Sequence, residues 1–169
     1  MEELLGRLLQ IPFWTRFADL HGLLAMAALV LFGSGIVLYF LSSQTKAAGI
    51  WLKGVLLLLF LDLIFLDGAG LLVYMPYRAP GGPRTILNAS SETAWLHTII
   101  FEHKEFLAFA PPLLIFCALA IVWVLSDSFT EEKTFPWLRK AVLTSLVLSL
   151  LFVLIVATEA VLVTKVAPV

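Results

Sequence analysis

The sequence predicts an all-α integral membrane protein, a four-helix bundle whose helices run up, down, up and down through the bilayer as a single domain, 1–169. Of its 169 residues 61% are hydrophobic and only 14% are charged, and the mean hydropathy is +1.01. In a soluble domain about a quarter of the residues are charged. Four segments also reach the roughly 20 residues that a helix needs to cross the hydrocarbon layer.

The first predicted element is a short interfacial N-terminal helix within residues 1–19. Leucines recur near helical spacing opposite Glu2, Glu3 and Arg7, a pattern typical of an amphipathic helix that lies at the membrane surface. Pro12 is expected to end this helix. Because the segment begins with acids and lacks a small-residue cleavage site, we expect it to stay attached to the chain.

The first predicted hairpin covers residues 20–75. Its first helix, 20–41, contains no Asp, Glu, Lys or Arg, and its second helix, 54–75, is interrupted only by Asp62 and Asp67. A polar turn with lysines separates the two helices. Two antiparallel membrane spans are therefore expected.

Residues 76–102 are predicted to form an extramembrane loop and the start of the third helix. The stretch YMPYRAPGGPRTILNASS is rich in Pro and Gly, which indicates an irregular loop. Ser91 followed by Glu92 resembles a helix cap. A helix from there to Leu125 would be about 50 Å long, so we expect its first turns to stand outside the membrane, with His97 in water or against a partner.

The second predicted hairpin covers residues 103–169. Its first helix, 106–125, is uncharged, and its second helix, 141–164, contains Glu159 as its only acid. Pro111-Pro112 remove backbone donors and should kink the first of these helices.

The basic residues predict the orientation of the chain. Short turns place both termini and the central loop on one membrane face and the two hairpin turns on the other. The turns hold a dense group of basic side chains, namely Lys46, Lys53, Lys133, Arg139 and Lys140. The positive-inside rule then puts the turns in the cytoplasm and the termini on the extracytoplasmic face. The net charge of −1 argues against nucleic acid as a partner.

The two hairpins also read as copies of one another. The first runs from HGLLAMAALVLFGSGIVLYFLSS through WLKG to VLLLLFLDLIFLDGAGLLVY, and the second from HKEFLAFAPPLLIFCALAIVWVLSDS through WLRK to AVLTSLVLSLLFVLIVATEAVLVT. The duplication places His21 and His103 at the mouths of equivalent helices, and Asp67 and Glu159 at similar depths. It therefore predicts two histidines at one end of one bundle.

These two histidines are candidate haem ligands. A haem in a helical bundle takes axial ligands from facing helices, and imidazole is the usual one. His21 and His103 would each bind the haem iron, and Arg78 and Arg84 in the central loop would pair with the propionates. The alternative is that His103, in the polar stretch 102–105, is a solvated residue at headgroup level.

The acids Asp62, Asp67 and Glu159 are the second group of candidate functional residues. Ionisable groups inside a span are costly, and by default they mark a pathway or a paired charge. A proton relay, a contact with a quinone head and hydrogen bonds to Ser34, Ser145, Ser149 or Thr158 are the roles we consider. Protonated acids that join helices are an equally well-supported alternative.

The four helices, the repeated hairpin and the histidines at helix mouths, as in HGLLAMAALVLFGSGIVLYF, resemble the small b-type cytochrome membrane subunits. The resemblance implies a subunit of a respiratory or photosynthetic type of electron-transfer complex that holds one haem b between His21 and His103. Diheme members carry histidines near both membrane faces, whereas the turn face of this chain has none, so no second haem is expected.

The resemblance implies the lipid bilayer, other membrane subunits and a quinol or a redox protein as partners. An electron-transfer or non-catalytic subunit is expected rather than an independent enzyme. Two further functions stay open from the sequence. One is a structural or assembly subunit of a larger membrane complex, and the other is a proton or ion pathway through the buried acids.

Overall fold

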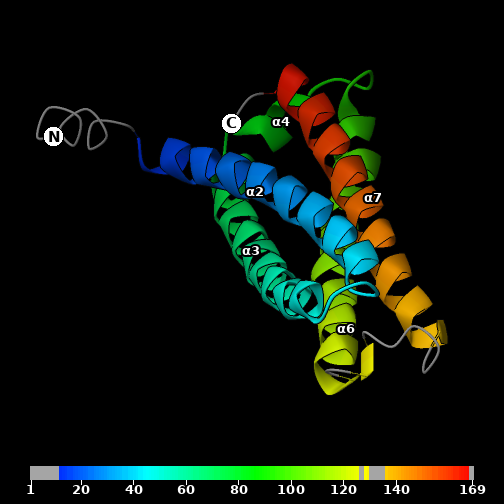
Figure 1. Ribbon diagram of the computed structural model, residues 1–169. Helices are drawn as coiled ribbons and strands as arrows, with labels where there is room; N and C mark the ends of the chain where they lie inside the picture. Colours follow the sequence, from blue (N-terminus) through cyan, green and yellow to red (C-terminus); the bar gives the residue numbers. More distant parts are fainter. Residues whose placement is uncertain (1–11, 126–127, 130–135, 168–169) are drawn as a thin grey trace, which may run out of the picture.

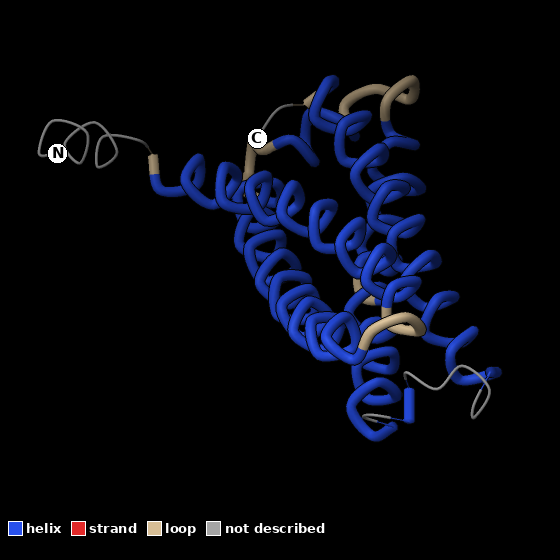
Figure 2. The backbone as a smooth tube through the Cα atoms, viewed as in Figure 1, coloured by secondary structure: helices blue, strands red, loops and turns tan. Residues whose placement is uncertain are grey.

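The computed structural model describes residues 12–125, 128–129 and 136–167. Within these ranges the regular structure is entirely helical, with no strand (Figure 2). The four long helices are α2 (Phe13–Leu41), α3 (Lys46–Arg78), α6 (Ala110–Leu125) and α7 (Pro136–Val166). Between α3 and α6 lie the short helix α4 (Pro83–Asn88), the π-helix η1 (Leu96–Phe101) and α5 (Glu102–Ala108).

Four stretches of this structure are long and apolar enough to cross a membrane: Phe13–Leu41, Lys46–Arg78, Leu96–Leu125 and Pro136–Val166. Most of their side chains face outward, because only 22 to 33% of each apolar window is buried inside the protein. An exterior as apolar as this matches hydrocarbon better than water. The structure therefore supports the predicted all-helical, multi-pass integral membrane protein.

The helices pack in neighbouring pairs. α2 lies along α3, α6 lies along α7, and α3 and α6 join the two pairs (Figure 1). Side chains close the turn between α2 and α3. Ser42 Oγ donates to the carbonyl of Tyr39 at 2.6 Å, and Thr45 Oγ1 accepts from the amide of Ala48 at 3.2 Å. These bonds satisfy backbone groups that a helix end leaves unpaired.

The first span begins earlier than the sequence predicted. α2 starts at Phe13, directly after Pro12, whose backbone is extended (φ −53°, ψ 143°). Residues 13–19, predicted to belong to the interfacial segment, are thus continuous with the first apolar helix, whose first hydrogen bond runs from the amide of Arg16 to the carbonyl of Pro12 at 3.2 Å. The preceding part of the predicted interfacial helix lies outside the described residues.

The central loop is more regular than predicted, since it contains α4. Gly81 has a left-handed backbone (φ 76°), which favours glycine. A Cβ on Gly82 would clash with the carbonyl oxygen of Pro76. The chain therefore turns sharply after α3, and Pro83 begins α4 at a position where its missing N–H costs nothing.

The third apolar stretch is interrupted twice. It is π-helical over Leu96–Phe101, and the helix breaks again at Phe109 between α5 and α6. The second break precedes Pro111-Pro112, where the sequence predicted a kink because proline lacks the N–H of the helical hydrogen bond. Ser149 of α7 donates to the carbonyl of Pro111 at 3.3 Å in the buried interior.

A hydrophobic core forms where the four long helices meet. Its fully buried members include Ala28, Phe32, Leu52, Leu56, Leu59, Ile115, Ala118, Val142 and Leu146. Gly35 allows α2 and α7 to approach, because a Cβ at this position would lie 3.4 Å from Cδ2 of Leu146. A second, smaller core joins Tyr77, Leu87, Leu96, Phe101, Val163 and Ala167 at the opposite end of the helices from the turns.

Arg139 connects the two helix pairs at the turn end. Its side chain is buried, and its guanidinium donates to the carbonyls of Phe129 and Tyr39 and to Oγ of Ser42. The same group lies over the rings of Tyr39 and Phe129, at 5.1 and 4.7 Å from their centroids. One cation thus satisfies carbonyls from separate segments, including the last turn of α2.

Candidate functional site

His21 is oriented by the backbone of α3. Its Nδ1 lies 3.0 Å from the carbonyl oxygen of Leu66. Because a carbonyl oxygen only accepts, Nδ1 carries the proton and donates it. Gly70 makes room for the ring, since a Cβ there would lie 3.2 Å from Cε1 of His21. Nε2 of this imidazole has no hydrogen bond to any residue that the structure describes.

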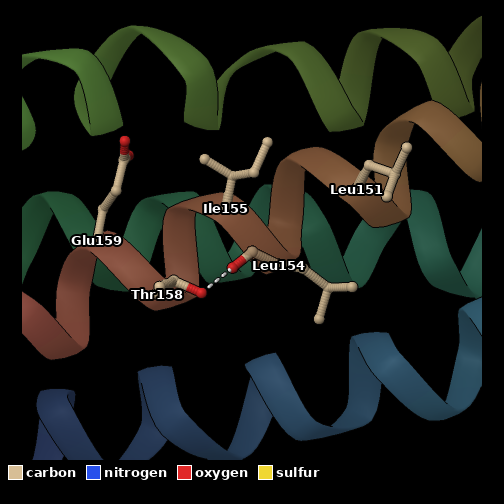
Figure 3. A pocket seen from close by; sticks show the side chains of 5 residues that line it. All are labelled: Leu151, Leu154, Ile155, Thr158 and Glu159. Atoms are coloured by element: carbon tan, nitrogen blue, oxygen red, sulfur yellow. Dashed lines mark hydrogen bonds between the residues drawn. The ribbon is translucent and has the colours of Figure 1, made fainter.

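His103 is oriented by a carboxyl group of α7. Its Nδ1 lies 2.7 Å from Oε1 of Glu159. Figure 3 shows Glu159 pointing from α7 toward the green ribbon that runs beside it. The His103 side chain is 56% exposed, whereas that of Glu159 is 12% exposed. Oε2 of Glu159 has no hydrogen-bond partner in the described part of the chain.

The two histidines are therefore held in the same manner. Nδ1 of each ring is hydrogen-bonded to an oxygen of the second long helix of its pair. The oxygen is the carbonyl of Leu66 in α3 for His21, and Oε1 of Glu159 in α7 for His103. Leu66 is adjacent to Asp67, the residue that the repeat aligns with Glu159. A carbonyl or carboxylate at Nδ1 fixes the tautomer in which Nε2 is free to bind a metal.

Each histidine bonds to a residue of its own helix pair, His21 to Leu66 and His103 to Glu159. No hydrogen bond between the two histidines occurs in the described structure. The principal contacts among the described helices link α2 with α3, α5 with α7 and α6 with α7, and α2 with α5 is not among them. No group of three or more His, Cys, Asp or Glu side chains is arranged to hold a metal ion within the described ranges. Axial ligation of a haem requires only two such ligands.

Two of the three candidate acids have a buried carboxyl oxygen without a hydrogen-bond partner in the described structure. Oδ2 of Asp62, like Oε2 of Glu159, is buried without a hydrogen-bond partner among the described residues. Three of the four hydroxyl groups considered as partners bond to backbone carbonyls: Ser34 to Val30, Ser149 to Pro111 and Thr158 to Leu154. These three hydroxyls donate their protons to a carbonyl one helical turn away or on the neighbouring helix, and not to the acids.

The two candidate propionate partners have separate environments. Arg78 lies at the end of α3, where Nη2 is 3.8 Å from Oε2 of Glu105 and the guanidinium is 4.5 Å from the ring centroid of Tyr74. Arg84 lies on α4 with its side chain exposed. Arg78 therefore already has a carboxylate and an aromatic ring beside it.

A buried pair that the sequence did not predict is formed by Tyr77 and His97. Tyr77 Oη lies 3.0 Å from Nδ1 of His97, and the two residues are only 2% and 3% exposed. The expectation that His97 faces water or a partner was therefore wrong. The π-helical turn changes the direction of side chains in this segment. α4 and α7 pack beside it, and the Tyr77 side chain reaches it from the end of α3.

An aromatic stack surrounds this pair. The rings of Tyr77 and Phe101 are parallel, with centroids 3.9 Å apart and planes at 3°. Tyr74 stacks on Tyr77 with centroids 6.1 Å apart and planes at 19°, and on Phe101 with centroids 5.8 Å apart and planes at 16°. The Lys104 ammonium lies 4.7 Å from the centroid of Phe101. Tyr74 and Tyr77, one turn apart near the end of α3, are the only signal of this stack in the sequence, and nothing in the sequence identifies Phe101 and His97 as their partners.

A shallow groove runs along α7 toward Glu159. It has a volume of about 280 Å³ and is lined by Leu151, Leu154, Ile155, Thr158 and Glu159 (Figure 3). Its apolar residues are on the exterior, since Leu154 and Ile155 are each more than two-fifths exposed. The Glu159 carboxyl and the Thr158 hydroxyl, which bonds the Leu154 carbonyl, thus form the polar end of a surface that is apolar elsewhere.

Comparisons with protein-family models, with curated proteins and with solved structures give no match to this chain.

Proposed function

We propose that this protein is a small integral membrane subunit of an electron-transfer complex and that it holds one b-type haem between His21 and His103. The observation that supports this proposal is the matching state of the two imidazoles. Nδ1 of each is bonded to the neighbouring helix of its own pair, and Nε2 of each has no bond to a described residue. Histidines that ligate metals are commonly oriented through their other ring nitrogen in this manner.

The residues present fit a haem iron in their chemistry. His21 and His103 supply two nitrogen ligands of the type that axial ligation uses. Glu159 would hold the His103 ring in its orientation through the contact at Nδ1, so that Nε2 faces away from α7 as the ligand atom. Gly70 keeps the space beside His21 free of a side chain. A haem supplies one-electron transfer when it is bound, and Arg78 and Arg84 are the proposed partners of its propionates.

The proposal includes the arrangement of the chain in the membrane. The four helices would form an up-down-up-down bundle of two duplicated hairpins, with an interfacial N-terminal helix and the termini on the extracytoplasmic face. The repeat of sequence and the equivalent placement of the Nδ1 partners support the duplication, and the basic residues of the turns support the orientation. Other membrane subunits and a quinol or a redox protein are the proposed partners.

A second candidate function is a proton or ion pathway through Asp62, Asp67 and Glu159. The specific observation in its favour is that two carboxyl oxygens, Oδ2 of Asp62 and Oε2 of Glu159, are buried without a partner in the described structure. Unpaired ionisable groups in a span are costly and commonly functional. Unchanged proton flux into liposomes after Asp67→Asn combined with Glu159→Gln would exclude this function.

A third candidate is a structural or assembly subunit, for which the exposed apolar faces of all four spans are the observation in favour. Co-purification of other membrane subunits in mild detergent, with no bound cofactor, would support it.

The visible spectrum of the purified protein, oxidised and then reduced with dithionite, tests the haem proposal. We expect a Soret band with low-spin character that His21→Ala and His103→Ala each abolish. His97→Gln is the control, because His97 is the only other histidine and its Nδ1 bonds Tyr77. No Soret band after expression with adequate haem would refute the proposal.

A further inference from the structure

From the break between α5 and α6 we infer a binding site for a proton. Asp67 of α3 holds the proton as a carboxylic acid and donates it in a hydrogen bond to the backbone carbonyl of Ala108. Three observations occur together here: a helix break inside a membrane span, an acid without a partner, and a packing register that brings the two to the same level. The inference goes beyond the haem proposal and does not depend on it. It also stands whether or not protons cross the protein.

The carbonyl oxygen of Ala108 has no backbone donor at the positions where a helix would supply one. The amide four residues on, which an α-helix uses, belongs to Pro112, and the amide three residues on, which a 3₁₀-helix uses, belongs to Pro111. Neither proline has an N–H group. Accordingly, α5 ends at Ala108 and α6 begins at Ala110. Because water is not available in the hydrocarbon layer, this carbonyl requires a donor from a neighbouring helix.

The packing of α3 on α6 brings Asp67 to this break. The rings of Phe60 and Phe116 are in contact between the two helices, with centroids 5.6 Å apart. The helices run in opposite directions (Figure 1). Since seven residues make close to two full turns, the same faces meet again about 10 Å nearer the outer end. The positions that meet there are Asp67 and Phe109, the residue at the break. This register places the Asp67 carboxyl at the end of α5, beside the Ala108 carbonyl.

Asp67 lacks a partner, whereas the other polar groups near this end of α3 are exposed or already paired. Asp67 is half-buried, and no hydrogen bond or ion pair joins it to another described residue. α6 carries no charged side chain, and its single titratable group, Cys117, is exposed. Asp19 of α2, Arg84 of α4 and Glu102 of α5 are exposed as well. The remaining titratable and charged groups on α2, α3 and α5 have these partners: His21 with the Leu66 carbonyl, His103 with Glu159, Glu105 with Arg78, and Lys104 with the Phe101 ring.

The chemistry of the site suits a proton and not a metal cation. The site offers one carboxyl group and one carbonyl oxygen, and the described chain brings no three His, Cys, Asp or Glu side chains together around a metal position. Hard metal cations take about six or more oxygen ligands. An ionised Asp67 would place acceptors side by side without a donor, at a depth where charge is expensive. A proton on Asp67 removes the charge and supplies the O–H donor that the Ala108 carbonyl lacks.

Infrared spectroscopy of the full-length protein in lipid detects this proton directly, because a protonated carboxyl group has a C=O stretching band separate from that of a carboxylate. We expect the unmodified protein at neutral pH to show a protonated-carboxyl band that Asp67→Asn removes. Replacement of Na⁺ by choline should leave this band unchanged. Pro112→Ala should shift the band, because the Ala108 carbonyl then has a backbone donor of its own. Identical protonated-carboxyl bands in the unmodified protein and Asp67→Asn would overturn the inference.

A double-mutant cycle tests the acceptor. We expect Asp67→Leu to lower the folding equilibrium constant about tenfold in the unmodified background, which corresponds to about 1.4 kcal/mol. In the Pro112→Ala background the effect should be much smaller, since the restored amide satisfies the Ala108 carbonyl. Asp62→Leu is the matched control, because Asp62 lies five residues away on another face of α3. Its effect should be the same in both backgrounds.

Equal effects of Asp67→Leu in the two backgrounds would show that the carboxyl and the carbonyl do not interact, and would overturn the inference. A band that responds to Na⁺ would assign the site to a metal cation and would overturn it as well. The infrared comparison with Asp67→Asn remains decisive where Asp67→Leu or Pro112→Ala fails to fold, because Asn has nearly the shape of Asp. Neither measurement uses haem, so the absence of a Soret band would refute the haem proposal and leave this inference untouched.

Discussion

Nδ1 of His103 lies 2.7 Å from Oε1 of Glu159, a contact that joins α5 to α7 across 56 positions of sequence. Its counterpart in the other helix pair is the bond between Nδ1 of His21 and the carbonyl of Leu66. The two contacts differ in chemistry, since one acceptor is a carboxyl group and the other a backbone carbonyl. A side-chain substitution can therefore remove the first acceptor, whereas the second responds only to changes in helix packing.

The haem proposal predicts that replacement of Glu159 weakens haem binding. Outer-shell partners of a metal-bound histidine typically contribute about 10-fold to 100-fold in affinity, so Glu159→Ala should reduce haem affinity by about that factor. Glu159→Gln keeps a carbonyl oxygen near Nδ1 and should retain most of the affinity. Titration of the haem-free protein with haem, followed by absorbance, measures both variants. Equal losses in the two variants would show that charge, and not orientation, is the contribution of Glu159.

Gly70 should tolerate a side chain less well than Gly68, its neighbour on α3. A Cβ at Gly70 would meet the His21 ring at 3.2 Å, whereas a Cβ at Gly68 meets nothing within 4 Å. Alanine in place of helical glycine ordinarily stabilises by roughly 0.5 to 1 kcal/mol. Gly68→Ala should show that gain, and Gly70→Ala should lose it because the ring must move. Thermal unfolding in detergent compares the two, and equal stabilisation would contradict the proposed close approach.

Removal of the Tyr77 hydroxyl should destabilise the end of the protein that carries the aromatic stack. Tyr77→Phe keeps the stack on Phe101 and leaves Nδ1 of the buried His97 without its partner. An unsatisfied buried polar group costs about 1 to 3 kcal/mol. Unfolding by denaturant, followed by tryptophan fluorescence, measures this loss.

The double variant Tyr77→Phe with His97→Phe is the control for this pair. It removes both polar partners, and the replacement of both by apolar groups is often nearly neutral. Its unfolding free energy should therefore exceed that of Tyr77→Phe alone. Strictly additive losses would mean that the two side chains do not interact.

Arg139→Met should destabilise the turn end by about 3 kcal/mol or more, because several buried acceptors lose a charged donor. The acceptors are the carbonyls of Phe129 and Tyr39 and Oγ of Ser42. Arg139→Lys should restore little, since an ammonium cannot reproduce the planar fork of donors. Lys140→Met, at the exposed neighbouring position, is the control and should change the unfolding free energy by less than about 0.5 kcal/mol.

Most errors of the sequence reading occur where one local signal has two structural outcomes. Residues 13–19 are predicted as part of an interfacial segment, whereas the structure starts the first long helix, α2, at Phe13, directly after Pro12. His97 was placed outside because a regular helix starting at Ser91 would carry it there. The π-helical turn and α4 place it instead beside Tyr77, an arrangement that neither composition nor periodicity signals.

The sequence by itself determined the four long apolar helices, because the length and hydropathy of a span are local properties and the thickness of the hydrocarbon layer sets the length required. It also marked His21, His103 and Glu159 as unusual for their positions. Only the tertiary structure decided their partners, because a hydrogen bond depends on which helices meet and in what register. The pairing of His103 with Glu159, the approach of His21 to α3 at Gly70 and the burial of His97 are all contacts between separate helices.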